Sequence, residues 1–393
     1  MTVALEQFRL SSHRQADPFV APRGEAARPV ATAPRVSRRV GGIAIGAIGG
    51  LGLAAIVVLI ALRGNAVATS LAFIAAVVPL VVVAATLCHL DRWEPEPPGL
   101  LVLAVAWGSG VATSLALVAS YTGQAALVSF IPKASQAEEL MVTIQAPLVE
   151  EALKGLGVVV LVVGAREKVS APLDGIVIAG LVGAGFAFTE NILYFVQAGE
   201  SVVVVFVLRA IASPFCHSMF TSFTGLAVAM GLTRMSRRRD RAGVAAVGLA
   251  TAVVLHAAWN GLATYIGAGF LVAYLAVWVP FFCGWFVVLW RVSRQEQRAI
   301  AVGLVPFVEG GWITSGEAAL VGDLRARRIA IGRARRRSRA LGRDMRRFVE
   351  TAARLALTRS LCAPHMEERA KTLIAEDLQR LEHVRDRLVR GNA

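Results

Sequence analysis

Three ionisable residues, Glu150, Glu151 and Lys154, lie in the middle of a segment that is otherwise apolar enough to cross a bilayer, MVTIQAPLVEEALKGLGVVVLVVG at 141–164. Insertion scales put the cost of one such charge near the bilayer centre at about 2.5–3.5 kcal/mol, so intramembrane charges are usually paired and functional. On a helix, Lys154 lies one turn from Glu150 and nearly one turn from Glu151, and it can neutralise either carboxylate. The segment therefore predicts either a reactive acid pair or a structural ion pair between helices.

Later apolar segments carry further polar groups. Glu190 and Asn191 follow a glycine-rich run, and His217 lies within SPFCHSMF. His256 and Asn260, in VLHAAWNG, are four residues apart and share one helix face. A single histidine in an apolar helix is more often a hydrogen-bonded core residue than a ligand. Polar groups on four successive segments, however, favour a shared polar cavity.

Carboxylates and imidazoles that face one cavity can activate a water molecule and stabilise an oxyanion, which are the two tasks of amide hydrolysis. The same groups can bind zinc through His217, His256 and a glutamate, because a catalytic zinc site uses three protein ligands and leaves one position open. The sequence has no HExxH motif, and we prefer a mechanism without a cofactor. Chains of Glu and His also relay protons, so a proton-coupled transporter is the alternative, although no internal repeat of the hydropathy pattern supports it.

The elements that must position these residues are transmembrane helices. The chain has 393 residues, of which 56% are hydrophobic, and its mean hydropathy is +0.61. At about 20 residues per crossing, the apolar segments predict an all-α, polytopic membrane bundle of about eight helices. The predicted spans are 41–62, 66–88, 99–121, 142–164, 173–195, 204–231, 243–264 and 270–290.

Basic residues in the short loops predict the orientation in the cell membrane. Arg166 and Lys168 follow the fourth span, and five arginines between 234 and 241 follow the sixth, so both loops are expected on the cytoplasmic side. Arg63 and Lys133 are the only basic residues in the loops that then lie outside. An even number of crossings places the N- and C-termini in the cytoplasm.

Two segments flank the predicted membrane domain at 41–290. Residues 1–40 are polar and rich in proline and arginine, and are expected to form a disordered cytoplasmic leader. Residues 291–393 form a basic tail that holds most of the net charge of +14. Its helical patterns predict amphipathic helices near the anionic inner leaflet. Nucleic-acid binding is not expected, because the tail has hardly any aromatic residues. A scaffold that anchors this tail is the third hypothesis.

Other charged residues have simpler expected roles. Asp91, Arg92, Glu94 and Glu96, in DRWEPEPP, are expected to be solvated, with the prolines stiffening the turn, and a folding or gating role is the alternative. Asp174 begins the fifth span, where a solvated carboxylate suits the helix N-terminus. Arg209 begins the sixth span and is expected to reach the outer interface. The cysteines have no ligand-like spacing, so neither disulfides nor a cysteine metal site are indicated.

Several of these motifs resemble the PrsW family of intramembrane proteases. They are EEALKG at 150–155, FAFTENILY at 186–194, the region of His217, and HAAWNG at 256–261. DRWEPEPP at 91–98 resembles the short acidic, proline-rich cytoplasmic loop of that family. The resemblance covers roughly residues 66–290, and excludes the leader and the tail. The family is similar to the CAAX prenyl endopeptidases, in which a paired-glutamate helix precedes helices bearing His and then His with Asn or Asp.

The resemblance implies roles for individual residues. Glu150 and Glu151 would be the essential acidic pair, one of them activating water, and Glu190 an auxiliary acid. His217 and His256 would hold the water or the tetrahedral oxyanion, with Asn260 aiding the latter. Lys154 and Asn191 would be structural or auxiliary. The implied substrate is a membrane-anchored protein, since family members are associated with site-1 cleavage of membrane-anchored anti-sigma factors.

Overall fold

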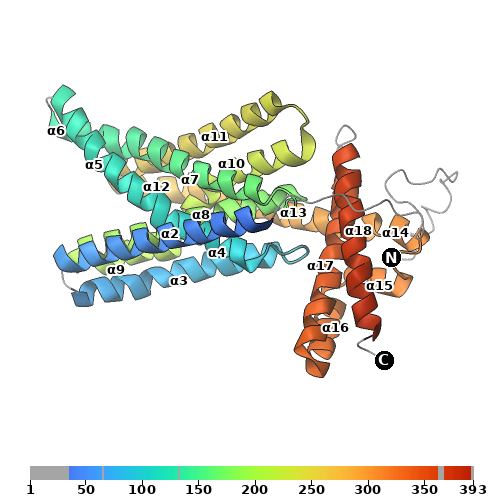
Figure 1. Cartoon of the computed structure of the whole chain (residues 1–393). Helices are drawn as coiled ribbons and strands as arrows, with labels where there is room; N and C mark the ends of the chain where they lie inside the picture. Colours follow the sequence, from blue (N-terminus) through green and yellow to red (C-terminus); the bar gives the residue numbers. More distant parts are fainter. Residues whose placement is uncertain (1–34, 64–65, 132, 362–366, 391–393) are drawn as a thin grey trace. The chain divides into compact units, whose positions relative to one another are not determined.

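The computed structural model describes residues 35–63, 66–131, 133–361 and 367–390. Within these ranges all regular elements are helices and there is no strand (Figure 1). The described residues fall into two compact units, a membrane unit that ends at Glu296 and a C-terminal unit that begins at Gln297. Most of the predicted leader lies outside the described residues, and the first described helix begins at Arg35, before the predicted boundary at residue 40.

The predicted all-α bundle is confirmed. The helices of the membrane unit, with α13 continuing past its end, are α2 (Arg35–Arg63), α3 (Ala66–Leu90), α4 (Pro98–Ala106), η1 (Trp107–Ala112), α5 (Thr113–Phe130), α6 (Ala134–Leu140), η2 (Met141–Gln145), α7 (Ala146–Gly164), α8 (Pro172–Gln197), η3 (Gly199–Ser201), α9 (Val202–Phe206), η4 (Val207–Ala212), α10 (Cys216–Arg234), α11 (Arg238–Tyr265), η5 (Gly267–Gly269), α12 (Phe270–Ala273), η6 (Tyr274–Trp278) and α13 (Val279–Gly303).

Seven helices among the described residues are long and apolar enough to cross a membrane, and they coincide with seven of the predicted spans. The remaining predicted span, 142–164, is also helical, as η2 and α7. It is not one of the seven, because its apolar sequence is interrupted by Glu150, Glu151 and Lys154. The side of the membrane on which each terminus lies stays a prediction.

Helix α8 is the centre of the membrane unit. In its most apolar stretch 83% of the residues are buried, against 39% or less in the other six candidate spans. It packs against α3 and α10 (Figure 1). A Cβ atom on Gly175 would lie 2.2 Å from the Gly225 carbonyl oxygen of α10, so glycine allows the two backbones to touch.

Two π-helical turns adjoin the helices that carry the polar groups. Turn η2 leads directly into α7, where Pro147 has no N–H to donate to the preceding turn. Turn η4 carries Arg209 and ends shortly before α10. Single π-turns inside helices are frequent at functional sites, since they change the direction in which side chains project.

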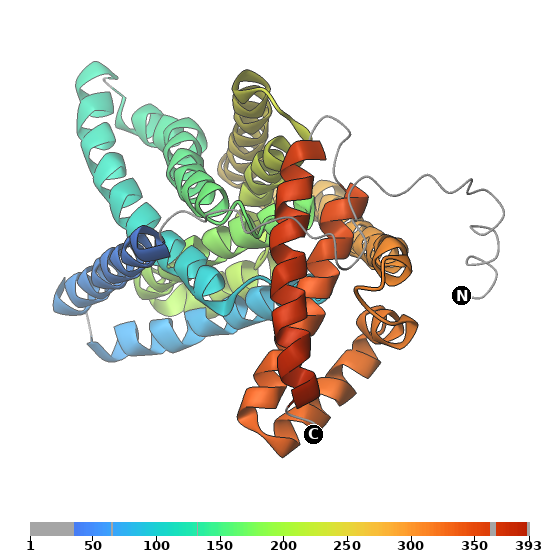
Figure 2. The same ribbon diagram turned by 45° about the vertical axis from the view of Figure 1, so that its right-hand side comes forward.

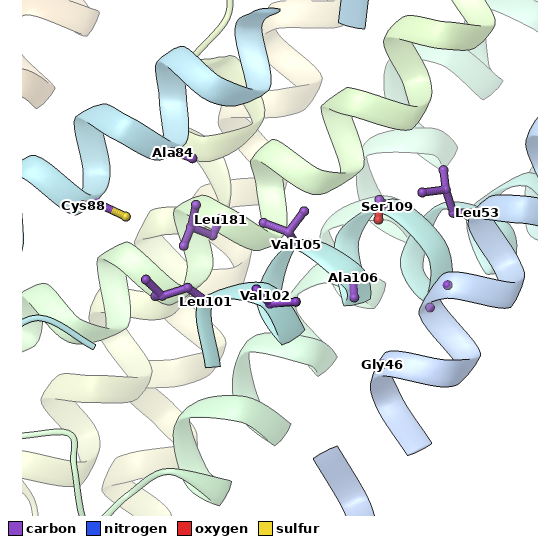
Figure 3. A pocket seen from close by; sticks show the side chains of 12 residues that line it. Gly46, Leu53, Ala84, Cys88, Leu101, Val102, Val105, Ala106, Ser109 and Leu181 are labelled. Carbon is purple, nitrogen blue, oxygen red and sulfur yellow. The ribbon is translucent and has the colours of Figure 1, made fainter. Parts of the chain in front are cut away.

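An apolar groove of about 420 Å³ lies between α2, α3, α4 and α8 (Figure 3). Small residues of α2 open it, and a cysteine of α3 and a serine of η1 are its most polar side chains. None of the intramembrane charges lines it, so it is separate from the polar cluster described below. The lining residues are Gly46, Gly49, Gly50, Leu53, Ala84, Cys88, Leu101, Val102, Val105, Ala106, Ser109 and Leu181.

The C-terminal unit is a helical domain with its own core. Its helices are α14 (Val305–Glu309), α15 (Ser315–Val321), α16 (Leu324–Arg337), α17 (Arg339–Leu361) and α18 (Glu367–Arg390). Helices α17 and α18 lie side by side (Figures 1 and 2). Phe348 and Leu355 of α17 and Ile374 and Leu381 of α18 are buried. The amphipathic helices predicted here therefore bury their apolar faces within the unit.

Candidate active site

The Lys154 ammonium binds three partners at once. Its Nζ lies 2.9 Å from Glu151 Oε1, 3.3 Å from Glu150 Oε2 and 3.1 Å from His217 Nδ1. The first two contacts follow from the helix spacing of α7, whereas the third joins α7 to α10. Lys154 and Glu151 are completely buried, and the side chain of Glu150 is 12% exposed. Of the two paired carboxylates, Glu150 is thus the more exposed.

Glu151 is held by hydrogen bonds from three helices. Lys154 of its own helix and His256 Nδ1 of α11, at 3.0 Å, bind Oε1. The Thr221 hydroxyl of α10 donates to Oε2 at 3.0 Å. Because a carboxylate only accepts, His256 donates from Nδ1 and has its other nitrogen, Nε2, as the acceptor. That nitrogen lies 3.9 Å from Glu150 Oε2.

His217 is oriented from both sides. Lys154 has only protons to offer, so Nδ1 of His217 is the acceptor and the proton of a neutral ring is on Nε2. Nε2 lies 2.8 Å from Glu190 Oε2 of α8. The ring also packs edge-on against His256, with 5.1 Å between the ring centroids. The two imidazoles predicted from separate spans therefore meet.

Glu190 binds a second cation, the partly buried Arg209 of η4. Arg209 Nη2 lies 2.5 Å from Glu190 Oε2, and its Nε donates to Asn191 Oδ1 at 2.7 Å. Its guanidinium also stacks over the Tyr194 ring. The expectation that Arg209 reaches the outer interface is wrong, because Glu190 and Asn191 of α8 draw it into the polar cluster. Asn191 is placed beside Arg209 and not among the paired glutamates.

Asn260 is placed apart from this network. Its Nδ2 donates to the Val142 carbonyl oxygen at 2.9 Å, which joins α11 to η2. His256 and Asn260 share a helix face as predicted, but among the described contacts only His256 binds a carboxylate of the cluster. Asn260 fixes the turn that leads into α7. The other five predicted catalytic residues, Glu150, Glu151, Glu190, His217 and His256, form one continuous network.

Aromatic rings enclose the network. The Lys154 ammonium lies 3.8 Å from the centroid of the Phe186 ring, and Phe220 stacks on His256 with 5.3 Å between centroids. These contacts limit access of water, so the charges act on each other in a low dielectric. Thr221 was not among the residues predicted from the sequence. The signal for Thr221 was present, because it lies four residues after His217 on the same face of α10.

The donor atoms of the cluster could hold a metal ion. Glu150, His217 and His256 each place one potential ligand atom within 4.8 Å of the others. Two histidines and one glutamate are a ligand set of catalytic zinc. A histidine that binds zinc is commonly oriented by a carboxylate on its other nitrogen, and Glu151 accepts such a hydrogen bond from His256 Nδ1. His217, however, has Lys154 on one nitrogen and Glu190 on the other, so it would have to exchange one of these partners for the ion.

The position of His217 depends on Gly183 of α8. A Cβ atom at residue 183 would lie 2.4 Å from the His217 carbonyl oxygen and 2.8 Å from the Ser218 nitrogen. We predict that Gly183→Ala shifts α10, lowers the free energy of unfolding by about 1–3 kcal/mol and reduces activity. Thermal unfolding in detergent checks this. Gly243→Ala on α11, where a Cβ meets nothing within 4 Å, is the control and should unfold no earlier than wild type. Equal behaviour of the two variants would contradict the prediction.

The charged network is shared by four helices of the membrane unit, α7, α8, α10 and α11. Residues 96–285 match the model of the PrsW family, described as intramembrane metalloproteases, which confirms the resemblance expected from the motifs. The membrane unit is thus that of an intramembrane peptidase. The comparisons with curated proteins and with solved structures give no match.

Proposed function

We propose that the protein is an intramembrane endopeptidase that hydrolyses a peptide bond of a membrane-associated protein. The observation that supports this most is the network in which Glu150, Glu151, Glu190, His217 and His256 meet from α7, α8, α10 and α11. A purely structural ion pair would need one carboxylate and one cation. Here a carboxylate with an exposed edge lies beside an imidazole nitrogen with a free lone pair.

Glu150 is the proposed general base. Its Oε2 and His256 Nε2 are 3.9 Å apart, too far for a direct hydrogen bond but suited to a bridging water. Glu150 takes one proton from this water as the oxygen attacks the carbonyl carbon of the peptide bond. The tetrahedral intermediate then collapses, the C–N bond breaks, and the protonated Glu150 gives its proton to the leaving amine.

The charge of the cluster favours this proton transfer. With both imidazoles neutral, the carboxylates of Glu150, Glu151 and Glu190 and the cations of Lys154 and Arg209 leave one net negative charge. When Glu150 takes the proton, the cluster becomes neutral. Neutrality is favourable in a poorly solvated site. Glu151 and Lys154 act as positioning residues, since they hold His256 and His217 in place.

A metal at Glu150, His217 and His256 would polarise the carbonyl and lower the pKa of a bound water. We prefer the glutamate mechanism, because both nitrogens of His217 already have partners within the network. The prediction is that purified, active protein contains less than stoichiometric zinc, and that a strong chelator leaves cleavage unchanged. Elemental analysis and a chelator titration check this. Stoichiometric zinc, with activity lost to chelator and restored by metal, would overturn the preference.

The proposed setting is the cell membrane, with both termini cytoplasmic and a membrane-anchored protein as substrate, an anti-sigma factor being one candidate. The exposed arginines of the C-terminal unit would face the anionic inner leaflet. Comparison of membrane proteomes from cells with wild type and with Glu150→Gln tests the function, because an uncut substrate should accumulate only with the variant. If no protein changes length, and proteoliposomes instead show proton flux, the transporter alternative replaces the proposal.

A further inference from the structure

A second group of carboxylates is buried at the predicted cytoplasmic end of the membrane unit. Asp91, Glu94 and Glu96 of the loop after α3 are 2%, 9% and 5% exposed, Asp174 at the start of α8 is 2% exposed, and Glu296 of α13 is 3% exposed. The expectation that the carboxylates of this loop and Asp174 are solvated is wrong, whereas Arg92 is exposed as expected. Trp93 of the same loop is buried as well.

Hydrogen bonds hold two chain segments together at this place, the loop after α3 and the residues around the start of α8. The Glu96 N–H donates to Asp91 Oδ2 at 3.0 Å, and the Ser170 hydroxyl donates to Glu94. Asp174 accepts the N–H groups of Ser170 and Ala171 at 2.7 and 2.9 Å, which fixes the first turn of α8. These bonds give a partner to Asp91 Oδ2 and hold Asp174 in position. They give none to Asp91 Oδ1.

Glu296 of α13 gives the clearest evidence that this group of carboxylates lacks a partner. Ser293, one turn earlier on α13, donates to the Leu90 carbonyl at 2.7 Å, so this face of α13 is turned toward the start of the acidic loop. Both carboxylate oxygens of Glu296 are buried and accept no hydrogen bond. Asp91 Oδ1 is also buried and accepts no hydrogen bond. Because Glu296 lies one turn after Ser293, it is on the face of α13 that is turned toward this loop.

The carboxylates of Asp91, Asp174 and Glu296 have no cationic side chain as a partner among the described residues. No lysine or arginine in the described ranges forms an ion pair with Asp91, Asp174 or Glu296. Burial, and then the charge of Asp174, raise the pKa of Asp91 well above its usual range. A buried, unpaired carboxylate is strongly unfavourable, and buried carboxylates are usually paired or bind a metal ion.

We propose that Asp91, Asp174 and Glu296 bind a hydrated divalent cation of the Mg²⁺ type. Among the described residues only Glu150, His217 and His256 bring three potential ligand atoms within 4.8 Å of one another, so the acidic cluster is wider than a dry metal cage. Mg²⁺ suits a wider site, because it keeps several of its waters and takes one or two carboxylates directly. The unpartnered oxygens of Glu296 and Asp91 are the direct ligands, and Asp174 binds through water.

The ion would join the end of α3, the start of α8 and the face of α13 that carries Glu296. Its expected effect is on stability, since an ion that binds the folded protein and not the unfolded chain raises the unfolding midpoint with concentration. This site is separate from the Glu150 network, so the inference does not depend on the proposed proteolysis.

The test is thermal unfolding of the full-length protein in detergent, after treatment with EDTA, at increasing MgCl₂ and constant ionic strength. A zinc-selective chelator is present throughout, so that the Glu150, His217 and His256 group contributes no response. We expect a saturable rise of several degrees for wild type. Glu296→Gln and Asp91→Asn should each abolish the rise, whereas Glu200→Gln, which changes an exposed carboxylate, should keep it.

The titration of the wild-type protein with Mg²⁺ tests the proposal even if a variant fails to fold. A flat response to Mg²⁺ would overturn the proposal and would indicate that the cluster is neutralised by protons alone. An undiminished response in folded Glu296→Gln would equally overturn it. As a direct measurement, Mn²⁺ binding followed by electron paramagnetic resonance should show one bound ion fewer in Glu296→Gln than in wild type.

Discussion

Glu150→Gln is expected to lower the rate of peptide cleavage by about 10²–10⁴-fold, the usual contribution of a positioned general base. The amide has nearly the shape of the carboxylate but cannot take a proton from water. Since Glu150 is partly exposed and makes only a 3.3 Å contact with Lys154, the fold should be retained. Cleavage in proteoliposomes, with unfolding temperature measured in parallel, checks both parts.

Glu151→Gln provides the matched comparison. Glu151 is fully buried and bound by Lys154, His256 and Thr221, so its loss should disturb the orientation of His256 and lower stability as well as cleavage. If Glu150→Gln cleaves at the wild-type rate while Glu151→Gln is inactive, the base is Glu151. If both variants are fully active, neither carboxylate takes part in the reaction.

Lys154→Met is expected to have the largest effect on stability. Removing one partner of a buried ion pair costs about 3–5 kcal/mol, because the remaining charge stays desolvated. Here the loss would leave Glu150 and Glu151 adjacent without their shared cation and would remove the contact to His217 Nδ1. Chemical unfolding in detergent measures the change in the free energy of unfolding.

Two further variants make the Lys154 prediction specific. Lys133→Met changes an exposed lysine and should alter stability little. The double variant Lys154→Met, Glu151→Gln removes both members of the fully buried pair, and should recover part of the lost stability without recovering cleavage. A double variant that is no more stable than Lys154→Met would show that Glu151 is not the charge that Lys154 neutralises.

The sequence was sufficient to predict the helices and the residues that meet in the site. Runs of apolar residues locate transmembrane helices, since a bilayer requires about 20 residues per crossing. Ionisable groups in such runs are costly, which is why Glu150, Glu190, His217 and His256 were identifiable one by one. Their convergence follows from the glycine contacts of α8, where Gly183 touches the backbone beside His217.

The pairing of charges was less accessible to sequence reasoning. Arg209 lies on a different helix from Glu190, and nothing in the local pattern indicates that η4 turns its side chain inward. The carboxylates of the acidic loop were predicted to be solvated because carboxylates usually are, whereas Asp91, Glu94 and Glu96 are buried. Such pairings depend on how helices far apart in the chain are packed, and periodicity within one segment carries no information about them.

If the Glu150 network splits a peptide bond with water, oxygen from the solvent enters the product, and isotopic labelling detects it. A single-span membrane protein that accumulates uncut in Glu150→Gln cells would be co-reconstituted with purified wild type in H₂¹⁸O, and the fragments analysed by mass spectrometry. We predict that one ¹⁸O enters the new C-terminal carboxylate, and that no fragment forms with Glu150→Gln. Intact substrate with wild type, or equal cleavage by the variant, would contradict it.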